Sequence, residues 1–301
     1  MPSNKIIYVS DLHGKREQYQ KLVSHAKKIS ADTIIIGGDI TPNPGGRIDI
    51  GEQRRFLQNS LPAYFISLKT GLPDCEVYLM LGNDDCASNL DVLEQQKELY
   101  TNIHNKRIQL TPDLELVGYS YVPITPFGLK DWEKYDLSII PFKYQDAYNE
   151  CKRMNHKLDG VKTNKNKWVR FAFTPEMELS DSIQKDLKGE LFTKSPEKTI
   201  YVTHTPPYNT NLDKIVRSYP FGSLPEKIPI GSIALRLFIE DYQPHLTLHG
   251  HIHEAVAVSG SFKDKIGKTP CLAPGNHPNS DKLAAIVLDA YDLEHAQRIL
   301  L

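Results

Sequence analysis

The stretch Leu246-Thr247-Leu248-His249-Gly250-His251-Ile252-His253 passes from a short apolar run directly into a group of histidines. The apolar part is typical of a buried strand, because it is short and is followed by a glycine. Where the backbone stays extended, side chains two positions apart point in the same direction. His251 and His253 can therefore bind one metal ion together, just beyond the end of a strand.

Other polar groups follow apolar runs in the same way. They are Asp11-Leu12-His13 after Ile6-Ile7-Tyr8-Val9, Gly38-Asp39 after Ile34-Ile35-Ile36, Gly82-Asn83-Asp84-Asp85 after Val77-Tyr78-Leu79-Met80, and His204 after Ile200-Tyr201-Val202. Parallel strands of one sheet end at the same edge, and ligands of α/β proteins bind outside that edge. We therefore expect these polar residues to gather there and to form the active site.

The first 120 residues alternate between strand and helix patterns. The expected strands are Lys5–Ser10, Thr33–Gly37 and Glu76–Leu81, and the expected helices are Arg16–Ile29, Glu52–Lys69 and Asn89–Leu99. This alternation indicates β-α-β units. Ile108–Leu110 and Leu114–Gly118 then predict a hairpin, so the sheet is expected to be mixed.

Residues 121–198 have a different pattern, rich in aromatic residues and lysine, which we interpret as an insert with helices near Lys143–Met154 and Glu178–Gly189. The expected elements after it are strands Thr199–Thr203, Leu246–His249, Ala255–Ser259, Leu283–Leu288 and Gln297–Leu300, and helix Gly231–Tyr242. The segments Thr41–Gly46 and Tyr219–Pro229 are rich in proline and glycine and are expected to be loops.

Composition and charge are those of an ordinary soluble protein. Of 301 residues, 40% are hydrophobic and 24% charged, and the formal net charge of −1 gives no general attraction to nucleic acid or anionic membranes. The cysteines Cys75, Cys86, Cys151 and Cys271 form no C-x-x-C pair and are expected to be reduced packing residues. We see neither a signal peptide nor a run of ~18 apolar residues, so we expect a cytoplasmic protein without a membrane partner.

The donor types predict a centre with two divalent ions. Such a centre needs one ligand with two acceptor oxygens between ions roughly 3.5–4 Å apart, and we assign Asp39 to that position. Asp11 and His13 form a pair two residues apart, like the histidines above. Asn83 adds a neutral oxygen, and His204 precedes Thr205-Pro206-Pro207, a stiff turn. All donors are oxygen or nitrogen, and such mixed sets accept Mn, Fe, Zn, Ni or Mg.

Each motif alone has a structural alternative. Asp11 can cap a helix, Gly38-Asp39 can form a turn, and His204 can be a hydrogen-bonded structural residue. What favours the metal centre is that all motifs occur together, each at the end of an apolar run.

Taken together, the motifs resemble the pattern of the calcineurin-like metallophosphoesterase superfamily, D-x-H, G-D, G-N-H-[D/E], H and G-H-x-H, over roughly residues 5 to 290. The resemblance implies an α/β fold, a four-layer α-β-β-α sandwich of two mixed β-sheets face to face and flanked by helices, with the metal site at the C-terminal ends of the strands. One domain over residues 1–301 is expected, with a helical insert or cap at about 121–198. The implied ligands are Asp11, His13, Asp39 and His253 for one ion and Asp39, Asn83, His204 and His251 for the other.

The chain departs from that pattern at one position. Asp84 stands where the family usually has a histidine that resembles a general acid. An ordinary aspartate has a pKa near ~3.9, and nearby dications lower it further, so Asp84 is a poor proton donor at neutral pH. Three outcomes are open: Asp85 repels the charge and keeps Asp84 protonated, His277 takes over, or the substrates have good leaving groups, which we favour. The candidate catalytic residues are Asp84, Asp85 and His251.

The predicted function is a metal-dependent phosphoester hydrolase, a phosphodiesterase or a phosphatase of phosphorylated small molecules including nucleotides, with two divalent ions and a metal-bound hydroxide. Aryl esters, phosphoanhydrides and nucleotides are expected to react faster than alkyl esters. The alternative is a metal-binding scaffold on the same fold with weak or no activity, because Asp84 replaces the histidine.

The segment Phe142–Phe171 is basic and carries aromatic residues. Its cations are Lys143, Lys152, Arg153, Lys157, Lys162, Lys165, Lys167 and Arg170, and Tyr144, Tyr148 and Trp168 lie between them. Such a segment can bind a nucleotide or nucleic acid by charge and stacking. We favour a solvated helix followed by a loop at Thr163–Lys167, so nucleic acid is the less favoured partner.

Overall fold

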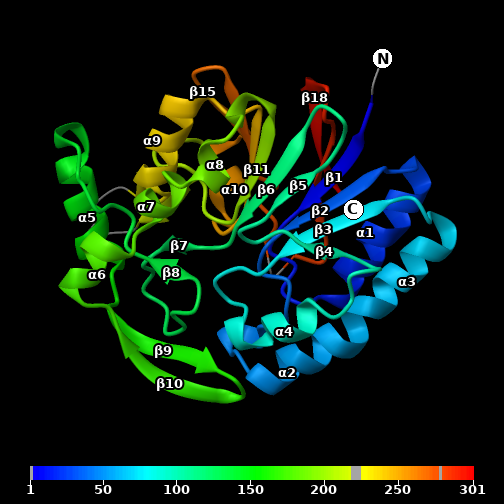
Figure 1. Cartoon of the computed structure of the whole chain (residues 1–301), viewed down its shortest axis with the longest axis horizontal. Coiled ribbons are helices and arrows are strands. Elements are labelled where there is room, and N and C mark those ends of the chain that lie inside the picture. Colours follow the sequence, from blue (N-terminus) through cyan, green and yellow to red (C-terminus); the bar gives the residue numbers. More distant parts are fainter. Residues whose placement is uncertain (1–2, 218–224, 278–279) are drawn as a thin grey trace.

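Two six-stranded sheets lie face to face in the computed structural model, with helices on their outer faces (Figure 1). The structure describes residues 3–217, 225–277 and 280–301. This architecture is the predicted four-layer α-β-β-α sandwich. Among the helices of the described residues, none combines the length and apolar composition that a bilayer span requires.

The first sheet is built around parallel strands. β1 (Lys5–Val9), β2 (Thr33–Gly37), β3 (Glu76–Met80) and the short β4 (Thr101–Asn102) run parallel, and β17 (Ala284–Asp289) and β18 (Asp292–Leu300) add an antiparallel edge beside β1. Val9 pairs with Ile36, and Gly37 pairs with Met80, so β1, β2 and β3 end at the same level. The polar residues after these ends therefore leave the sheet at one edge.

The second sheet has the same plan. β6 (Glu115–Tyr119), β11 (Thr199–Thr203), β14 (Leu246–His249) and β16 (Thr269–Leu272) run parallel, and the antiparallel strands β5 (Arg107–Gln109) and β15 (Lys263–Ile266) form its edges. The antiparallel β5–β6 pair confirms the predicted hairpin. Thr203 pairs with His249, so the chain leaves β11 and β14 at the same point.

Successive side chains of each strand enter two different cores. Along β1, Ile7 packs with helices α1 (Arg16–Ile29) and α3 (Leu61–Gly71) on the outer face, whereas Ile6 and Tyr8 face the second sheet. On the far side of the second sheet, Tyr201 packs beneath helix α9 (Ile233–Tyr242). The strands are buried on both faces, which is why the sequence shows them as continuous apolar runs.

The remaining elements near the core are short. They are η1 (Pro44–Gly46), α2 (Ile50–Arg55), the π-helical turn η2 (Phe56–Ser60), η3 (Ala87–Asn89), α4 (Leu90–Leu93), α10 (Ala255–Ser259), and the paired strands β12 (Lys214–Arg217) and β13 (Glu226–Pro229). The helical run from α2 to α3 covers the expected helix Glu52–Lys69. The expected loop Tyr219–Pro229 lies partly outside the described residues, and its last four residues form β13.

Two sequence-based elements were wrong. Ala255–Ser259 was expected to be a strand, but it forms α10, which ends at Gly260 in a left-handed conformation with φ 84°. The alternating valines that suggested a strand lie on a single turn of helix. The expected helix Asn89–Leu99 is reduced to the four residues of α4 and is followed by turns.

Residues 121–198 contain helices and strands. They form β7 (Val122–Pro123), β8 (Glu133–Lys134), η4 (Phe142–Tyr144), α5 (Gln145–Asn155), β9 (Asp159–Asn164), β10 (Lys167–Ala172), α6 (Pro175–Ser180), α7 (Ile183–Leu187), α8 (Glu190–Thr193) and η5 (Pro196–Lys198). The expected helix Glu178–Gly189 is split at Ser182, whose side chain caps α7. The expected loop at Thr163–Lys167 is the end of a hairpin, β9–β10, which extends along the edge of the molecule (Figure 1).

Candidate metal centre

The seven predicted ligands meet at the rim where strands of both sheets end. Asp11 and His13 follow β1, Asp39 follows β2, Asn83 follows β3, His204 follows β11, and His251 and His253 follow β14. Side chains from the two sheets approach closely: Asp11 Oδ1 lies 3.5 Å from His253 Nε2 and 4.0 Å from His204 Nε2. The rim is therefore one polar cluster that both sheets build.

Four of these residues form a compact donor group. Asp11, His13, Asp39 and His253 each place one donor atom within 4.8 Å of the others. His13 Nε2 lies 3.3 Å from His253 Nε2 and 3.9 Å from Asp39 Oδ2. The group joins two carboxylates to two imidazoles, a combination that suits divalent transition metals. It is a candidate site for one ion.

A second donor group includes Asp39 again. His204 Nε2 lies 3.1 Å from Asn83 Oδ1 and 3.4 Å from Asp39 Oδ2, and the ring centroids of His204 and His251 are 5.4 Å apart. His204 Nδ1 lies 2.8 Å from the carbonyl oxygen of Gly37 and donates its proton there. The other nitrogen, Nε2, therefore faces the cluster, where it would offer its lone pair to a bound cation, as in many metal-binding histidines.

The backbone at the cluster is held in a rarely used conformation. Asp11, His13, Asp39 and His251 have φ values of 59°, 44°, 51° and 67°. Residues other than glycine adopt this left-handed region at a cost of order 1–3 kcal/mol each, and such positions concentrate at functional sites. Backbone hydrogen bonds hold it in place, including His13 N to Asp39 O at 2.8 Å. The orientation of these side chains is thus imposed by the fold.

Two glycines allow the ligands to approach the backbone. A Cβ atom at Gly82 would overlap with Asp39 Oδ1 and lie 2.7 Å from His204 Nε2. A Cβ atom at Gly250 would overlap with Ser10 Oγ and lie 2.8 Å from Asp11 Oδ2. Any side chain at these positions would displace a donor of the cluster.

The cluster contains two buried carboxylates whose ion-pair partners, within the described residues, are histidines only. Burial lowers the pKa of His204, but the charges of Asp39 and Asp11 outweigh that effect and raise this pKa to about 10. Burial and the charge of His204 lower the pKa of His251 to about 3. A buried carboxylate needs a compensating positive charge, and a bound cation would supply it in place of a protonated histidine. The donors, their burial and their charge therefore fit divalent ions.

Asp84 lies beside the cluster, and amide groups hold its carboxylate. Asn43 Nδ2 donates to one oxygen, and Asn83 Nδ2 donates to the other at 2.8 Å. Burial and the charges of Asp39 and Asp85 raise the pKa of Asp84 to about 7. Bound dications would act in the opposite direction. Sequence reasoning did not identify Asn43, which lies in the loop after β2 without a motif of its own.

Asp85 is buried and bonded to the backbone of two loops. Its oxygens accept hydrogen bonds from the amides of Ile40 at 3.0 Å, Thr41 at 2.9 Å and Gly82 at 2.8 Å, and also from the Thr41 hydroxyl. These contacts join the loop after β2 to the loop after β3. Asp85 as a catalytic residue stays a prediction, and its contacts give it a role in positioning Asp39 and Asn83.

Two further histidines lie close to the rim. The ring of His277 is centred 6.4 Å from that of His253. His249 is buried, and its ring contacts the carbonyl oxygens of Thr203 and Thr205 and the hydroxyl of Thr247. His249 is therefore a structural residue beneath the cluster.

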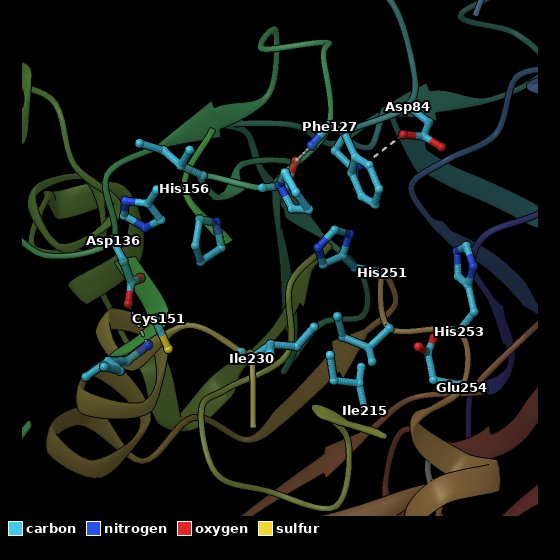
Figure 2. Close-up of a pocket in the computed structure, with 18 of the residues that line it drawn as sticks. Asp84, Phe127, Asp136, Cys151, His156, Ile215, Ile230, His251, His253 and Glu254 are labelled. Atoms are coloured by element: carbon cyan, nitrogen blue, oxygen red, sulfur yellow. Dashed lines mark hydrogen bonds between the residues drawn. The ribbon is translucent and has the colours of Figure 1, made fainter. Parts of the chain in front are cut away.

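A cavity of about 280 Å³ opens beside the cluster. Figure 2 shows His251, His253 and Asp84 on its wall with Phe127 and Ile230. The insert contributes Pro123, Ile124, Thr125, Pro126, Phe127, Asp136, Tyr148, Cys151 and His156. Of these residues, only Tyr148 was expected from the sequence as a possible ligand contact, because residues 123–127 and the positions after them carry no regular spacing that points to a ligand.

The sequence profile of the calcineurin-like phosphoesterase family matches residues 4–255, a range that includes all seven predicted ligands. The chain belongs to this family. No curated protein matches it. The family is one of phosphoesterases that typically bind divalent metals, and this chain carries a group of possible metal ligands, Asp11, His13, Asp39 and His253.

The chain is also similar to solved structures from several organisms. The protein TT1561 of Thermus thermophilus is 16% identical over 99% of each chain, with a TM-score of 0.54. A dimetal phosphatase from Danio rerio is 13% identical over 100% of this chain and 99% of its own, with a TM-score of 0.48. A novel archaeal phosphodiesterase is 11% identical over 99% of each chain, with a TM-score of 0.42. The likeness to TT1561 supports the fold and nothing finer.

Proposed function

We propose that this chain is a phosphoester hydrolase that works with two divalent ions at the rim. The observation that carries the proposal is the position of Asp39 between two donor groups. Asp39 Oδ2 lies 3.9 Å from His13 Nε2 and 3.4 Å from His204 Nε2, and these histidines belong to different groups. A carboxylate in this position is what a two-metal centre requires of its shared ligand.

Asp11, His13, Asp39 and His253 would hold one ion, and Asp39, Asn83, His204 and His251 would hold the other. When bound, such ions neutralise phosphate oxygens and lower the pKa of water to near 7. The chain itself fixes the donors. The carbonyl of Gly37 orients His204, and Asp11 accepts a hydrogen bond from the backbone amide of His251 at 3.0 Å. Asn83 and His251 also line the cavity, so they face a substrate bound there.

The leaving group is expected to depart with little help from a protonated side chain. The position of the usual imidazole is occupied by Asp84, whose two oxygens both accept hydrogen bonds from amides. Rates should therefore depend steeply on the basicity of the leaving group. A series of substituted phenyl phosphodiesters measures this dependence, and equal kcat/KM values for aryl and alkyl leaving groups would contradict it.

The test of the function is metal removal and restoration. The purified chain is treated with chelator and then given Mn, Fe, Zn, Ni or Mg separately, and both metal content and hydrolysis of bis(4-nitrophenyl) phosphate are measured. We expect two ions per chain at full activity. Asp39→Asn should lose metal and rate, whereas Asp91→Asn, at an exposed ion pair with Arg54, should keep both.

A metal-loaded chain that hydrolyses no phosphoester would favour the scaffold alternative. One ion per chain at full activity would remove the two-metal proposal and leave the hydrolase.

A further inference from the structure

Two cavities meet at Asp84. The first is the one described above, and the second, of about 400 Å³, is lined by Asn43, Gly46, Ile48, Asp84, Phe127, Gly128, Leu129, Val161 and Trp168. Asp84 and Phe127 line both. Residues 123–126 line the first cavity, and residues 128–129 line the second. The Phe127 ring is therefore part of the wall between two spaces that both reach Asp84, beside the metal cluster.

Neither cavity is built for a polyanion. Within the described residues, no lysine or arginine lines either of them. The acidic side chains Asp84, Asp136 and Glu254 line the first cavity instead. Asp136 is occupied with the helix α9, where it accepts a hydrogen bond from the amide of Ile233 at 2.7 Å. A chain of phosphates would meet carboxylates here, and recognition of phosphate requires cations.

Three cations of the insert are engaged elsewhere, and among the described residues none of its cations lines either cavity. Lys152 pairs with Glu178 at 2.7 Å, and Lys143 pairs with Glu240 at 3.1 Å. Lys162 lies over the ring of Phe171, 3.9 Å from its centroid. The basic segment of the sequence therefore gives neither cavity a positive wall.

Much of each cavity wall is apolar. Ile124, Ile215, Ile230 and Ile233 line the first cavity, and Ile48, Leu129, Val161 and Trp168 line the second. The volumes of the two cavities lie near the lower end of the range found for ligand pockets. Each cavity therefore suits a small ring system. One polar atom is available in the first cavity: His156 Nδ1 is buried and has no hydrogen-bond partner among the described residues. Figure 2 shows His156 at the opposite end from His253.

We propose that the preferred substrates are phosphodiesters with two uncharged, largely apolar substituents, one in each cavity, with the phosphate beside Asp84. This inference rests on the proposed hydrolase function and narrows its substrate class. A diester carries two organic groups on one phosphorus and needs two spaces that meet at the phosphate. A monoester would fill one of them, and a phosphoanhydride would place charge against an apolar wall.

The experiment uses one leaving group and three esters. The full chain, loaded with manganese, is given 4-nitrophenyl phosphate, methyl 4-nitrophenyl phosphate and bis(4-nitrophenyl) phosphate, and kcat/KM is measured for each. Ile215→Lys changes the first cavity, and Trp168→Ala changes the second. For each ester, kcat/KM is compared between variants. The intrinsic reactivity of an ester is the same for every variant, so it does not affect this comparison.

Matched controls lie on the same strands. Val216→Lys and Val169→Ala change neighbours of Ile215 and Trp168 that point to the opposite faces and are 49% and 45% exposed. Metal content is measured for every variant. Ile230→Ala is the second variant of the first cavity, and it is used where Ile215→Lys lowers the melting temperature.

Both cavity variants are expected to lower kcat/KM for the bis(aryl) ester by about tenfold, the effect of losing one well-packed contact of ~1.4 kcal/mol. The methyl ester has one ring, so at most one of the two variants should affect it. The control variants should change kcat/KM for either ester by no more than about twofold.

The proposal is overturned if neither variant lowers kcat/KM more than its control does, if both variants lower kcat/KM for the methyl ester as much as for the bis(aryl) ester, or if the monoester is the best substrate. A metal-loaded wild-type chain that cleaves none of these compounds would instead refute the proposed hydrolase function.

Discussion

Asp85→Ala is expected to destabilise the chain before any metal is bound. The Asp85 carboxylate has no exposed surface, and it accepts four hydrogen bonds, three from backbone amides and one from the Thr41 hydroxyl. Alanine would leave these donors buried without partners. Because a net loss of about 1 kcal/mol accompanies each such bond, the free energy of unfolding should fall by about 4 kcal/mol.

The effect should extend to metal binding, because the bonded amides belong to the metal-ligand loops. Ile40 and Thr41 follow the proposed ligand Asp39, and Gly82 precedes the proposed ligand Asn83. Without Asp85, the loops after β2 and β3 lose three of the hydrogen bonds that connect them, those from the Ile40 amide, the Thr41 amide and the Thr41 hydroxyl. Metal affinity should therefore fall together with stability, while the metal-saturated variant should keep much of its turnover.

The assay is urea unfolding of the chelated protein, followed by metal titration and by turnover at saturating metal. Asp91→Ala removes a carboxylate whose side chain is 56% exposed and which pairs with Arg54, and it should cost well under about 1 kcal/mol. The loss of unfolding free energy in Asp85→Asn should lie between the losses in Asp85→Ala and Asp91→Ala, because asparagine keeps one acceptor oxygen. A loss of turnover at full metal content, with unchanged unfolding, would refute the positioning role and make Asp85 a catalytic residue.

Three further outcomes follow from the structure. Gly82→Ala should reduce metal affinity at least about tenfold, because the added Cβ would overlap with Asp39 Oδ1. Gly51→Ala in α2 should leave metal affinity unchanged, and a competition titration measures both variants. Burial, with the charges of Lys134 and Lys106, lowers the pKa of His104 to about 3. The contribution of neutral His104 to stability is therefore fully present above pH 6.5, the pKa of the unfolded chain, and is lost as the pH falls toward 3. His104→Gln should therefore flatten the pH dependence of the free energy of unfolding below pH 6.5. Lys130→Met should cost about 3–5 kcal/mol because it leaves Glu133 buried and unpaired, and the double variant Lys130→Met/Glu133→Leu should be more stable than this single one in urea unfolding.

The fold and the ligand positions were predictable because they depend on a simple property of the strands. Strands buried on both faces appear as apolar runs, and their ends appear as the first polar residues after each run. Asp11, Asp39 and His204 could be placed by this rule alone. This rule does not show which of the ligands meet, because the distance between Asp11 and His253 depends on how the two sheets pack.

The elements that were wrong are short and lie where tertiary contacts decide the conformation. Ala255–Ser259 alternates like a strand, yet it directly follows a ligand loop and has room for one helical turn before Gly260. Half of the residues in the hairpin strands β9 and β10 are polar, and these strands pair with each other outside the two sheets. Periodicity says little about such segments, because no face of them is continuously buried.

The position of the cluster between two sheets links metal binding to the packing of the whole core. The carbonyl of His204 accepts a hydrogen bond from the amide of Gly250 at 3.0 Å, which joins the loops after β11 and β14. Gly250 in turn abuts Ser10 at the end of β1, and Tyr8 of that strand packs in the core between the sheets. An ion held by Asp11 and His253 would contact residues of both sheets at once. By linkage, an ion that binds the packed sheets and not the unfolded chain would stabilise the sandwich by RT ln(1 + [M]/Kd).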